Sequence, residues 1–177
     1  MRSTLLATAF AVAIAASAWS PGAHAGGLYD QRAVWLDDQA HAFSMHALSG
    51  TPTVLTLAYG ACRRVCASSL RVMQQVQALA DERHLQLSFV VVGLDPTEDR
   101  PGDWAQYRAT RGLTRPNWQF LTGSNTAVHQ LAQRLGVHYW RYGEHTMHDF
   151  RIVLLSADGA VIRTVDDTSQ PPERLLP

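Results

Sequence analysis

Runs of apolar residues alternate with amphipathic stretches along this chain, and the alternation predicts strands and helices in turn. Apolar positions recur at helical spacing from about 64 to 83, and shorter helices are expected over 102–110 and 124–135. Strands are expected in the β-branched and apolar runs at 53–58, 85–94, 118–121, 150–155 and 160–165. The order of strand–helix pairs followed by a hairpin predicts an α/β fold with parallel central strands.

Short local signals mark where these elements begin and end. Ser124 is expected to cap the start of a helix, and Gly136 is expected to end it. Asp158-Gly159 is a strong signal for the turn of a hairpin. Residues 26–50 indicate an irregular or hairpin-forming entry with a turn at its Asp-Asp pair, and residues 171–177 are expected to form a short tail.

The first 25 residues have the pattern of a secretory signal peptide. Arg2 supplies a short positive start, and an uncharged apolar stretch of about 14 residues follows at 5–18. Small residues then allow cleavage after Ala25. A membrane anchor is the alternative, but the apolar stretch is shorter than the ~20 residues that span a bilayer. We therefore expect export to the periplasm and one mature domain over residues 26–177.

The charge composition argues against two classes of partner. The chain has 15 Lys and Arg residues against 15 Asp and Glu residues, which gives a formal net charge of zero. Such a chain has no electrostatic preference for nucleic acid or for an anionic membrane. Contact with a membrane is therefore expected only through a partner protein.

Cys62 and Cys66 are the two cysteines of the chain, and their spacing is informative. A disulfide between residues four positions apart closes a very small loop, so it contributes little stability through loop entropy. The pair lies where the first core strand gives way to a long helix, and a helix start with Arg63 and Arg64 favours thiolates. Thiolates bind soft ions such as Cu(I) and exchange with disulfides, so metal binding, redox chemistry and a structural disulfide all remain open.

Histidines near the C-terminal strands offer further metal ligands. His148 stands just before the strand expected at 150–155. In a thioredoxin-like sheet the loop before that strand lies over the cysteine-bearing helix, so His148 is a candidate third ligand. His138, His145 and Met147 are expected on an exposed loop, from which they could assist copper capture.

A series of motifs in order along residues 48–165 resembles the SCO/SenC family of copper-binding, thioredoxin-fold proteins. The resembling segments are the strand entry 50–55, the cysteine motif 59–66, the strand end 91–99, the strand and turn 118–123, the helix end 131–137 and the block 148–159. The resemblance implies a thioredoxin-like fold in which helices flank a central mixed sheet with a C-terminal hairpin. The chain departs from the family pattern at Arg63 and Ala67, where prolines often stand, and at Asp149, where a serine is usual.

The resemblance also implies a site and a function. Copper, as Cu(I) or Cu(II), would be bound by Cys62, Cys66 and His148. Asp95 would lie behind the ligands and orient or modulate the thiolates, as outer groups do at metal sites generally. A turn cap is the alternative role for Asp95. The implied function is a periplasmic metallochaperone for a respiratory copper enzyme, foremost the binuclear copper site of cytochrome c oxidase subunit II.

Two other functions remain open. In the first, Cys62 and Cys66 form the redox pair of a thiol–disulfide oxidoreductase that acts on the cysteines of the recipient copper site, with a thiol–disulfide reductant as its own partner. In the second, the protein is a copper sensor or buffer without a dedicated recipient. The cysteine spacing separates redox chemistry from metal binding only imperfectly: redox enzymes of the thioredoxin type use C-x-x-C, whereas three residues stand between these two cysteines.

Overall fold

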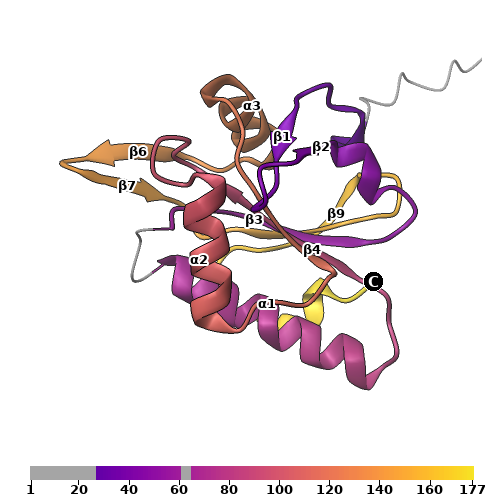
Figure 1. The fold of residues 1–177 in the computed structure, drawn as a ribbon. Coiled ribbons are helices and arrows are strands. Elements are labelled where there is room, and N and C mark those ends of the chain that lie inside the picture. Colours follow the sequence, from indigo (N-terminus) through magenta and orange to yellow (C-terminus); the bar gives the residue numbers. More distant parts are fainter. Residues whose placement is uncertain (1–26, 61–64) are drawn as a thin grey trace, which may run out of the picture.

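A five-stranded mixed sheet forms the centre of the molecule (Figure 1). The computed structural model describes residues 27–60 and 65–177, without the side chains of Val65 and Cys66, so the expected signal peptide lies outside the described residues. In spatial order the strands are β5 (Trp118–Leu121), β4 (Ser88–Gly93), β3 (Thr53–Ala58), β8 (Ile152–Leu155) and β9 (Val161–Val165). β3, β4 and β5 are parallel, whereas β8 is antiparallel to both β3 and β9. The predicted parallel centre and C-terminal hairpin are confirmed.

Three helices cover the two faces of this sheet. They are α1 (Val65–Glu82), α2 (Pro101–Arg111) and α3 (Asn125–Leu135). The helices α1 and α2 share one core with Val54 and Phe89, whereas α3 shares the other core with Leu55 and Val90. Successive residues of a strand point to opposite faces, so the unbroken apolar runs of β3 and β4 serve both cores.

The predicted ends of α3 are confirmed by their cap geometry. The Ser124 side chain accepts a hydrogen bond from the backbone N–H of Ala127, which satisfies one of the free donors at the helix start. Gly136 ends the helix with a φ of 65°, in the left-handed region that favours glycine. The described residues also include three short 3-10 helices, Leu28–Asp30, Met45–Leu48 and Pro172–Leu175.

The N-terminal entry contains the hairpin that its sequence indicated. β1 (Trp35–Leu36) pairs antiparallel with β2 (Ala42–Phe43) as a small separate sheet. At its turn, one carboxylate oxygen of Asp37 accepts the backbone N–H groups of Gln39 and His41. An aspartate that bonds its own following backbone in this way fixes a turn. The Asp-Asp pair therefore marks the turn correctly.

A second hairpin occupies the stretch in which an exposed loop was expected around the histidines. β6 (Tyr139–Tyr142) and β7 (His145–His148) form a two-stranded antiparallel sheet that projects from the body at the left of Figure 1. Gly143 stands in the turn with a φ of 60°, which suits a two-residue hairpin turn. The loop prediction is wrong for His145 and Met147, because polar and aromatic residues alternate along these strands and leave no apolar pattern that would predict them. His138 lies before β6, outside the strands, and is exposed as expected.

The C-terminal residues pack into the core, and the prediction of a tail is wrong. Leu175 is fully buried and Leu176 is 3% exposed, and both belong to the core that α1 covers. Arg163 on β9 donates a hydrogen bond to the carbonyl oxygen of Leu176. A segment of seven residues with three prolines has no periodicity, so its burial leaves no pattern in the sequence.

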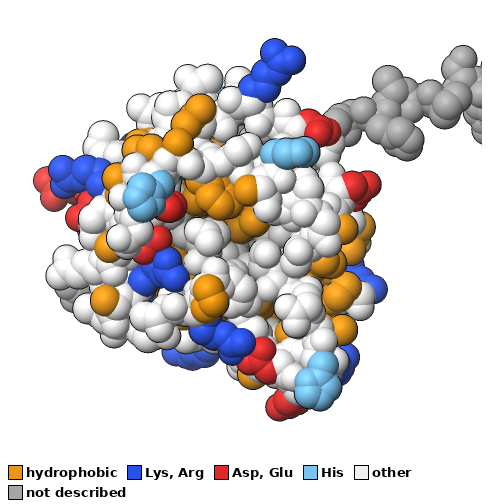
Figure 2. Space-filling view, turned by 45° about the vertical axis from the view of Figure 1, so that its right-hand side comes forward, with side chains coloured by type: hydrophobic (Ala, Val, Ile, Leu, Met, Phe, Trp, Pro, Cys, Tyr) orange, Lys and Arg blue, Asp and Glu red, His pale blue; other side chains and the backbone are white. Residues whose placement is uncertain are grey.

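Charged side chains of both signs are interspersed on the face that Figure 2 shows. This distribution agrees with the net charge of zero and gives that face no field of one sign. Over residues 27–60 and 65–177, none of the helices combines the length and the hydropathy that crossing a bilayer requires.

Leu175→Ala is expected to lower the free energy of unfolding by about 2–4 kcal/mol, because it leaves a cavity in a packed core. Urea denaturation measures the change. Ile162→Ala is the control, since Ile162 is 48% exposed on β9 and should cost about 1 kcal/mol or less. Equal losses in the two variants would show that the C-terminal segment does not contribute to the core as described.

Candidate metal-binding site

Three segments that are far apart in the sequence meet at one edge of the central sheet. β3 and β4 are parallel, with Ala58 opposite Gly93, so the chain leaves both strands at the same edge. β8 is antiparallel to β3, with Ile152 opposite Thr56, so the chain that precedes β8 arrives at this edge too. The predicted cysteine ligands follow Ala58, and the predicted histidine ligand precedes Ile152. The sheet register therefore directs both parts of the predicted ligand set to one edge.

The cysteines are described only in part. Cys62 lies outside the described residues, and for Cys66 the structure describes the backbone, as the second residue of α1. The first turn of a helix has free N–H groups and the positive end of the helix dipole, both of which favour a thiolate. Among the described side chains, no three His, Cys, Asp or Glu residues gather as a metal site. The predicted site thus depends on the cysteines together with His148.

His148 is the last residue of β7 and is only 7% exposed. Its Nδ1 atom lies 2.8 Å from the backbone carbonyl oxygen of Asp149. A carbonyl oxygen can only accept, so in the neutral ring Nδ1 donates its proton and Nε2 has the lone pair. Burial lowers the pKa of His148, although the hydrogen bond to Asp149 opposes this effect. A neutral imidazole with its lone pair at Nε2 is a form that binds metal ions.

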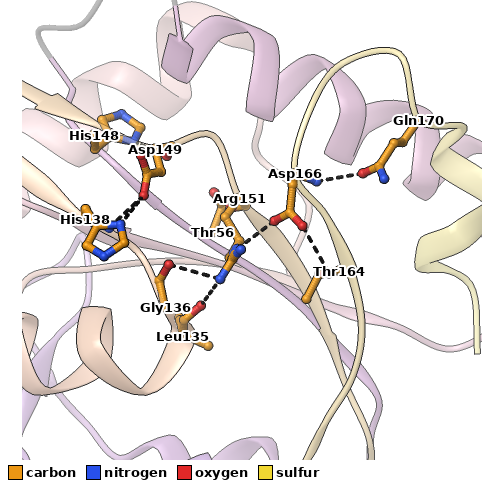
Figure 3. Close-up of polar contacts among 10 residues, drawn as sticks. All are labelled: Thr56, Leu135, Gly136, His138, His148, Asp149, Arg151, Thr164, Asp166 and Gln170. Atoms are coloured by element: carbon orange, nitrogen blue, oxygen red, sulfur yellow. Dashed lines mark hydrogen bonds and ion pairs between the residues drawn. The ribbon is translucent and has the colours of Figure 1, made fainter.

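Asp149 closes the base of the β6–β7 hairpin (Figure 3). Its Oδ2 atom accepts the backbone N–H of His138 at 2.9 Å and lies 2.8 Å from His138 Nδ1. The backbone N–H of Asp149 donates in return to the carbonyl oxygen of His138. The backbone hydrogen bond from His138 is the largest cause that lowers the pKa of Asp149. The aspartate that departs from the family pattern therefore supplies the contact that holds the hairpin closed next to His148.

Arg151 anchors the same segment to the rest of the fold (Figure 3). Its Nη1 atom donates to the carbonyl oxygens of Leu135 and Gly136 at 2.8 and 3.0 Å, and its Nε atom pairs with Asp166 at 2.6 Å. The carbonyl groups at the end of a helix have no partner within the helix, so this guanidinium satisfies the end of α3. The chain between His148 and β8 is thus fixed to both α3 and the segment after β9.

Asp95 follows β4 and contacts the hairpin. Its Oδ1 atom accepts the backbone N–H and the hydroxyl of Thr97 at 3.0 and 2.6 Å, and its Oδ2 atom accepts from Arg141 Nη1 at 2.8 Å. Burial would raise the pKa of Asp95, but the hydrogen bonds from Thr97 and the charge of Arg141 outweigh it and lower the pKa. Asp95 therefore caps a turn and also holds the hairpin, and its influence on the thiolates stays a prediction.

Asp99 has a structural position that the sequence did not reveal. The residue is 1% exposed, and its two carboxylate oxygens accept the backbone N–H groups of Gly60 at 2.7 Å and of Asp95 at 2.9 Å. Burial raises the pKa of Asp99 to about 7, although both backbone hydrogen bonds oppose the rise. The sequence signal is a second aspartate four positions after Asp95. Asp99 thus connects the residue that precedes the cysteine segment to the loop after β4.

Two glycines make room for Asp99. A Cβ atom at Gly93 would stand 2.5 Å from the Cβ of Asp99, and one at Gly60 would stand 3.0 Å from its carboxylate oxygen. Real Cβ atoms do not approach another carbon to 2.5 Å, so Gly93 is required for this packing. The strand ends at this edge are therefore shaped around a buried carboxyl group.

The arrangement of strands and helices defines a thioredoxin-like protein, and comparison with known proteins gives its family. The profile described as SCO1/SenC matches residues 29–176, and the chain belongs to this family. A SCO1 protein homolog of Bacillus subtilis is 21% identical over 133 residues, which cover 73% of this chain and 69% of that protein. A further match, to a protein of Stutzerimonas stutzeri, covers 63% of that relative's length.

Solved structures of Sco proteins share the fold. Arabidopsis thaliana ScoI with copper bound matches with a TM-score of 0.71 and 17% identity, over 80% of this chain and 89% of that chain. BsSco, described as a member of the Sco family of cytochrome c oxidase assembly proteins with a disulfide switch, matches with a TM-score of 0.68 and 19% identity, over 78% and 83%. The predicted family and thioredoxin-like fold are confirmed.

Asp99→Asn is expected to lower the free energy of unfolding by about 1–3 kcal/mol, since the amide NH₂ would face one of the two backbone N–H donors and leave it unsatisfied. In the wild-type protein a protonated Asp99 still accepts both N–H groups, because each of its carboxyl oxygens retains a lone pair. The matched control is Asp30→Asn, an exposed aspartate in the first 3-10 helix. Urea denaturation at pH 5 compares the variants, and equal stability of Asp99→Asn and wild type would contradict the two-acceptor role.

The raised pKa of Asp99 predicts a pH dependence of stability. Below about pH 4 the carboxyl group is protonated in both the folded and the unfolded chain. Between about pH 4 and pH 7 only the folded chain keeps the proton, so stability falls as pH rises and levels off above pH 7. Denaturation across this range should show a fall in wild type that is smaller in Asp99→Asn. Identical pH profiles for the two proteins would refute the raised pKa.

Proposed function

We propose that this protein binds one copper ion through Cys62, Cys66 and His148 and supplies it to a respiratory copper enzyme. In this proposal the protein acts in the periplasm after removal of residues 1–25. Membership of the SCO1/SenC family and the copper-bound structure of Arabidopsis ScoI support copper as the cargo. Beyond copper binding, the proposal specifies which residues bind the ion, which protein receives it and in which compartment the protein acts.

The state of His148 is the observation that carries the proposal. This imidazole is buried at the sheet edge to which the cysteine segment also leads, and its hydrogen bond to Asp149 leaves the lone pair at Nε2. Two thiolates and one imidazole form a soft set of donors that suits copper. Because His148 is fixed by the hairpin base, it offers a rigid nitrogen to an ion held mainly by sulfur.

The proposed recipient is the binuclear copper site of cytochrome c oxidase subunit II. The description of BsSco as a cytochrome c oxidase assembly protein supports this choice. Transfer would proceed by ligand exchange: a cysteine of the recipient binds the ion as one ligand of the donor leaves, and the copper keeps its oxidation state. Three protein ligands leave a coordination position through which such an exchange can begin.

His148→Ala is expected to weaken copper binding by at least about tenfold, because loss of a direct ligand should cost no less than loss of an outer group at a metal site. Titration of the reduced protein with copper, followed by the thiolate-to-copper absorption, measures the affinity. His129→Ala is the matched control, an exposed histidine on α3. Unchanged affinity in His148→Ala, or no absorption in wild type, would exclude the three-ligand site. Transfer to a purified subunit II domain then tests the recipient.

Thiol–disulfide exchange at the same cysteines is the second candidate function, and the disulfide switch described for BsSco favours it. In this reaction the thiolates of Cys62 and Cys66 give two electrons to a disulfide of the recipient copper site. They become a disulfide, while the target disulfide becomes two thiolates, which can then take up protons from water. His148→Ala should leave this exchange intact and a single Cys66→Ser substitution should stop it at a mixed disulfide. Mass spectrometry of the trapped mixture distinguishes redox activity from copper delivery.

A further inference from the structure

The β6–β7 hairpin has two chemically different faces. On one face of the hairpin, Trp140 is opposite Met147 and Tyr142 is opposite His145. On the other face, Arg141 is opposite Thr146 and Tyr139 is opposite His148. Thr146 and His148 are 4% and 7% exposed, so their face is turned to the body. Trp140, Tyr142 and Met147 are 51%, 73% and 41% exposed, and His145 is exposed as well. We call these four residues the outer face of the hairpin.

The outer face brings a thioether and an imidazole within reach of one ion. His145 and Met147 are two positions apart on one strand, so they point the same way with about 7 Å between their Cα atoms. Both side chains are long enough to meet midway between these positions. Methionine sulfur is a soft ligand that selects Cu(I), and imidazole also binds copper. The pair therefore has the chemistry and the spacing of a surface site for a soft monovalent cation.

Trp140 adds to the same site from the opposite strand. Residues that face each other across an antiparallel pair have Cβ atoms about 5 Å apart, so the indole ring can reach the Met147 side chain. The face of an indole ring attracts a cation within about 6 Å. Arg141 points to the inner face and is paired with Asp95, and the turn has the acidic Glu144. The charges of the hairpin thus do not repel a cation on the outer face.

The exposure of these side chains contrasts with that of the same residue types elsewhere in the described residues. Met45 and Met73 are 1% and 0% exposed, and both lie in the core. The described tryptophans other than Trp140 are Trp35, Trp104 and Trp118, which are all at most 2% exposed. Packing explains these core positions but does not explain a methionine and a tryptophan that face each other in solvent beside a histidine.

We propose that Met147 Sδ and one imidazole nitrogen of His145 bind Cu(I) on the outer face of the hairpin, with the Trp140 ring beside the ion. Each ligand atom donates one lone pair, the thioether loses no proton, and the oxidation state of copper does not change. This site is separate from the cysteine site, but Met147 adjoins His148 in the chain. The choice of Cu(I) rests on the copper cargo of the proposed function, but the site uses none of the ligands proposed there.

Methionine methyl NMR tests the site directly. In Cys62→Ser/Cys66→Ser/His148→Ala protein, in which the cysteine site is removed, Ag(I) serves as a redox-inert probe for Cu(I). The Met147 methyl resonance should shift and saturate at one equivalent, while the buried Met45 and Met73 resonances stay in place and report that the protein is folded. Tryptophan fluorescence should be quenched over the same range, and Trp140→Phe should remove this response.

Two exposed substitutions complete the test. In the same background, His145→Gln should weaken Ag(I) binding by at least about tenfold, because loss of a direct ligand should cost no less than loss of an outer group. His129→Gln on α3 should change nothing. In protein with both cysteines intact, Met147→Leu should lower the Ag(I) stoichiometry by one without changing the thiolate absorption. A Met147 resonance that stays unmoved in excess Ag(I), or equal affinity with and without His145, would overturn the proposal and leave the outer face as a surface for protein contact. Neither result depends on whether the cysteine site binds copper.

Discussion

The position of β3 between a parallel and an antiparallel neighbour is the constraint on which this site depends. All six residues of β3 are buried, so the strand cannot shift by one position without turning apolar side chains from one core to the other. Its register with β4 and β8 then fixes where three chain segments leave or enter the sheet. Thr56 reinforces this register because its hydroxyl donates to the carbonyl oxygen of Arg151 at 2.8 Å. The site edge is thus a consequence of core packing.

A continuous series of polar contacts extends from this edge to the hairpin. The N–H of Gly60 donates to Asp99, Asp99 also accepts the N–H of Asp95, and the Asp95 carboxylate pairs with Arg141 on β6. Asp149 closes the base of the same hairpin, next to His148. These contacts join the residue before the cysteine segment to the hairpin whose last residue is His148. Buried acceptors that are hydrogen-bonded resist rearrangement, which keeps Asp95, Asp99 and the hairpin that ends in His148 in a fixed arrangement.

Sequence reasoning succeeded where hydrophobic pattern or turn chemistry is strong. The apolar runs located the five strands of the central sheet, and Ser124 and Gly136 located the ends of α3, because these signals are local. The glycine of the strand-and-turn motif at 118–123 was recognised only by resemblance. Its physical reason is tertiary: a Cβ at Gly123 would stand 2.4 Å from the ring of Trp35, which is far away in the sequence.

Prediction from the sequence was wrong or incomplete where the burial of a residue depends on partners that are distant in the chain. Leu175 has no periodic neighbours, and the β6–β7 hairpin alternates polar residues instead of apolar ones, so neither produced a recognisable pattern. Asp99 was visible as a motif residue, but a sequence cannot show that its two oxygens accept the backbone N–H groups of Gly60, after β3, and of Asp95, after β4. Of the predicted site residues, His148 and Asp95 are placed at the expected edge. The cysteine side chains lie outside the described residues, so their part of the site stays a prediction.

The contact between Thr56 and Arg151 also has a consequence for the order of folding. These residues are 95 positions apart in the chain, so the antiparallel half of the sheet closes a long loop before it gains any contact energy. Pairing of β3 with β4 through α1 spans a much shorter loop and is expected to come first. The cysteine segment belongs to this early unit, whereas His148 arrives with β8. During folding, the thiols would therefore meet oxidants and metal ions before the histidine is in place.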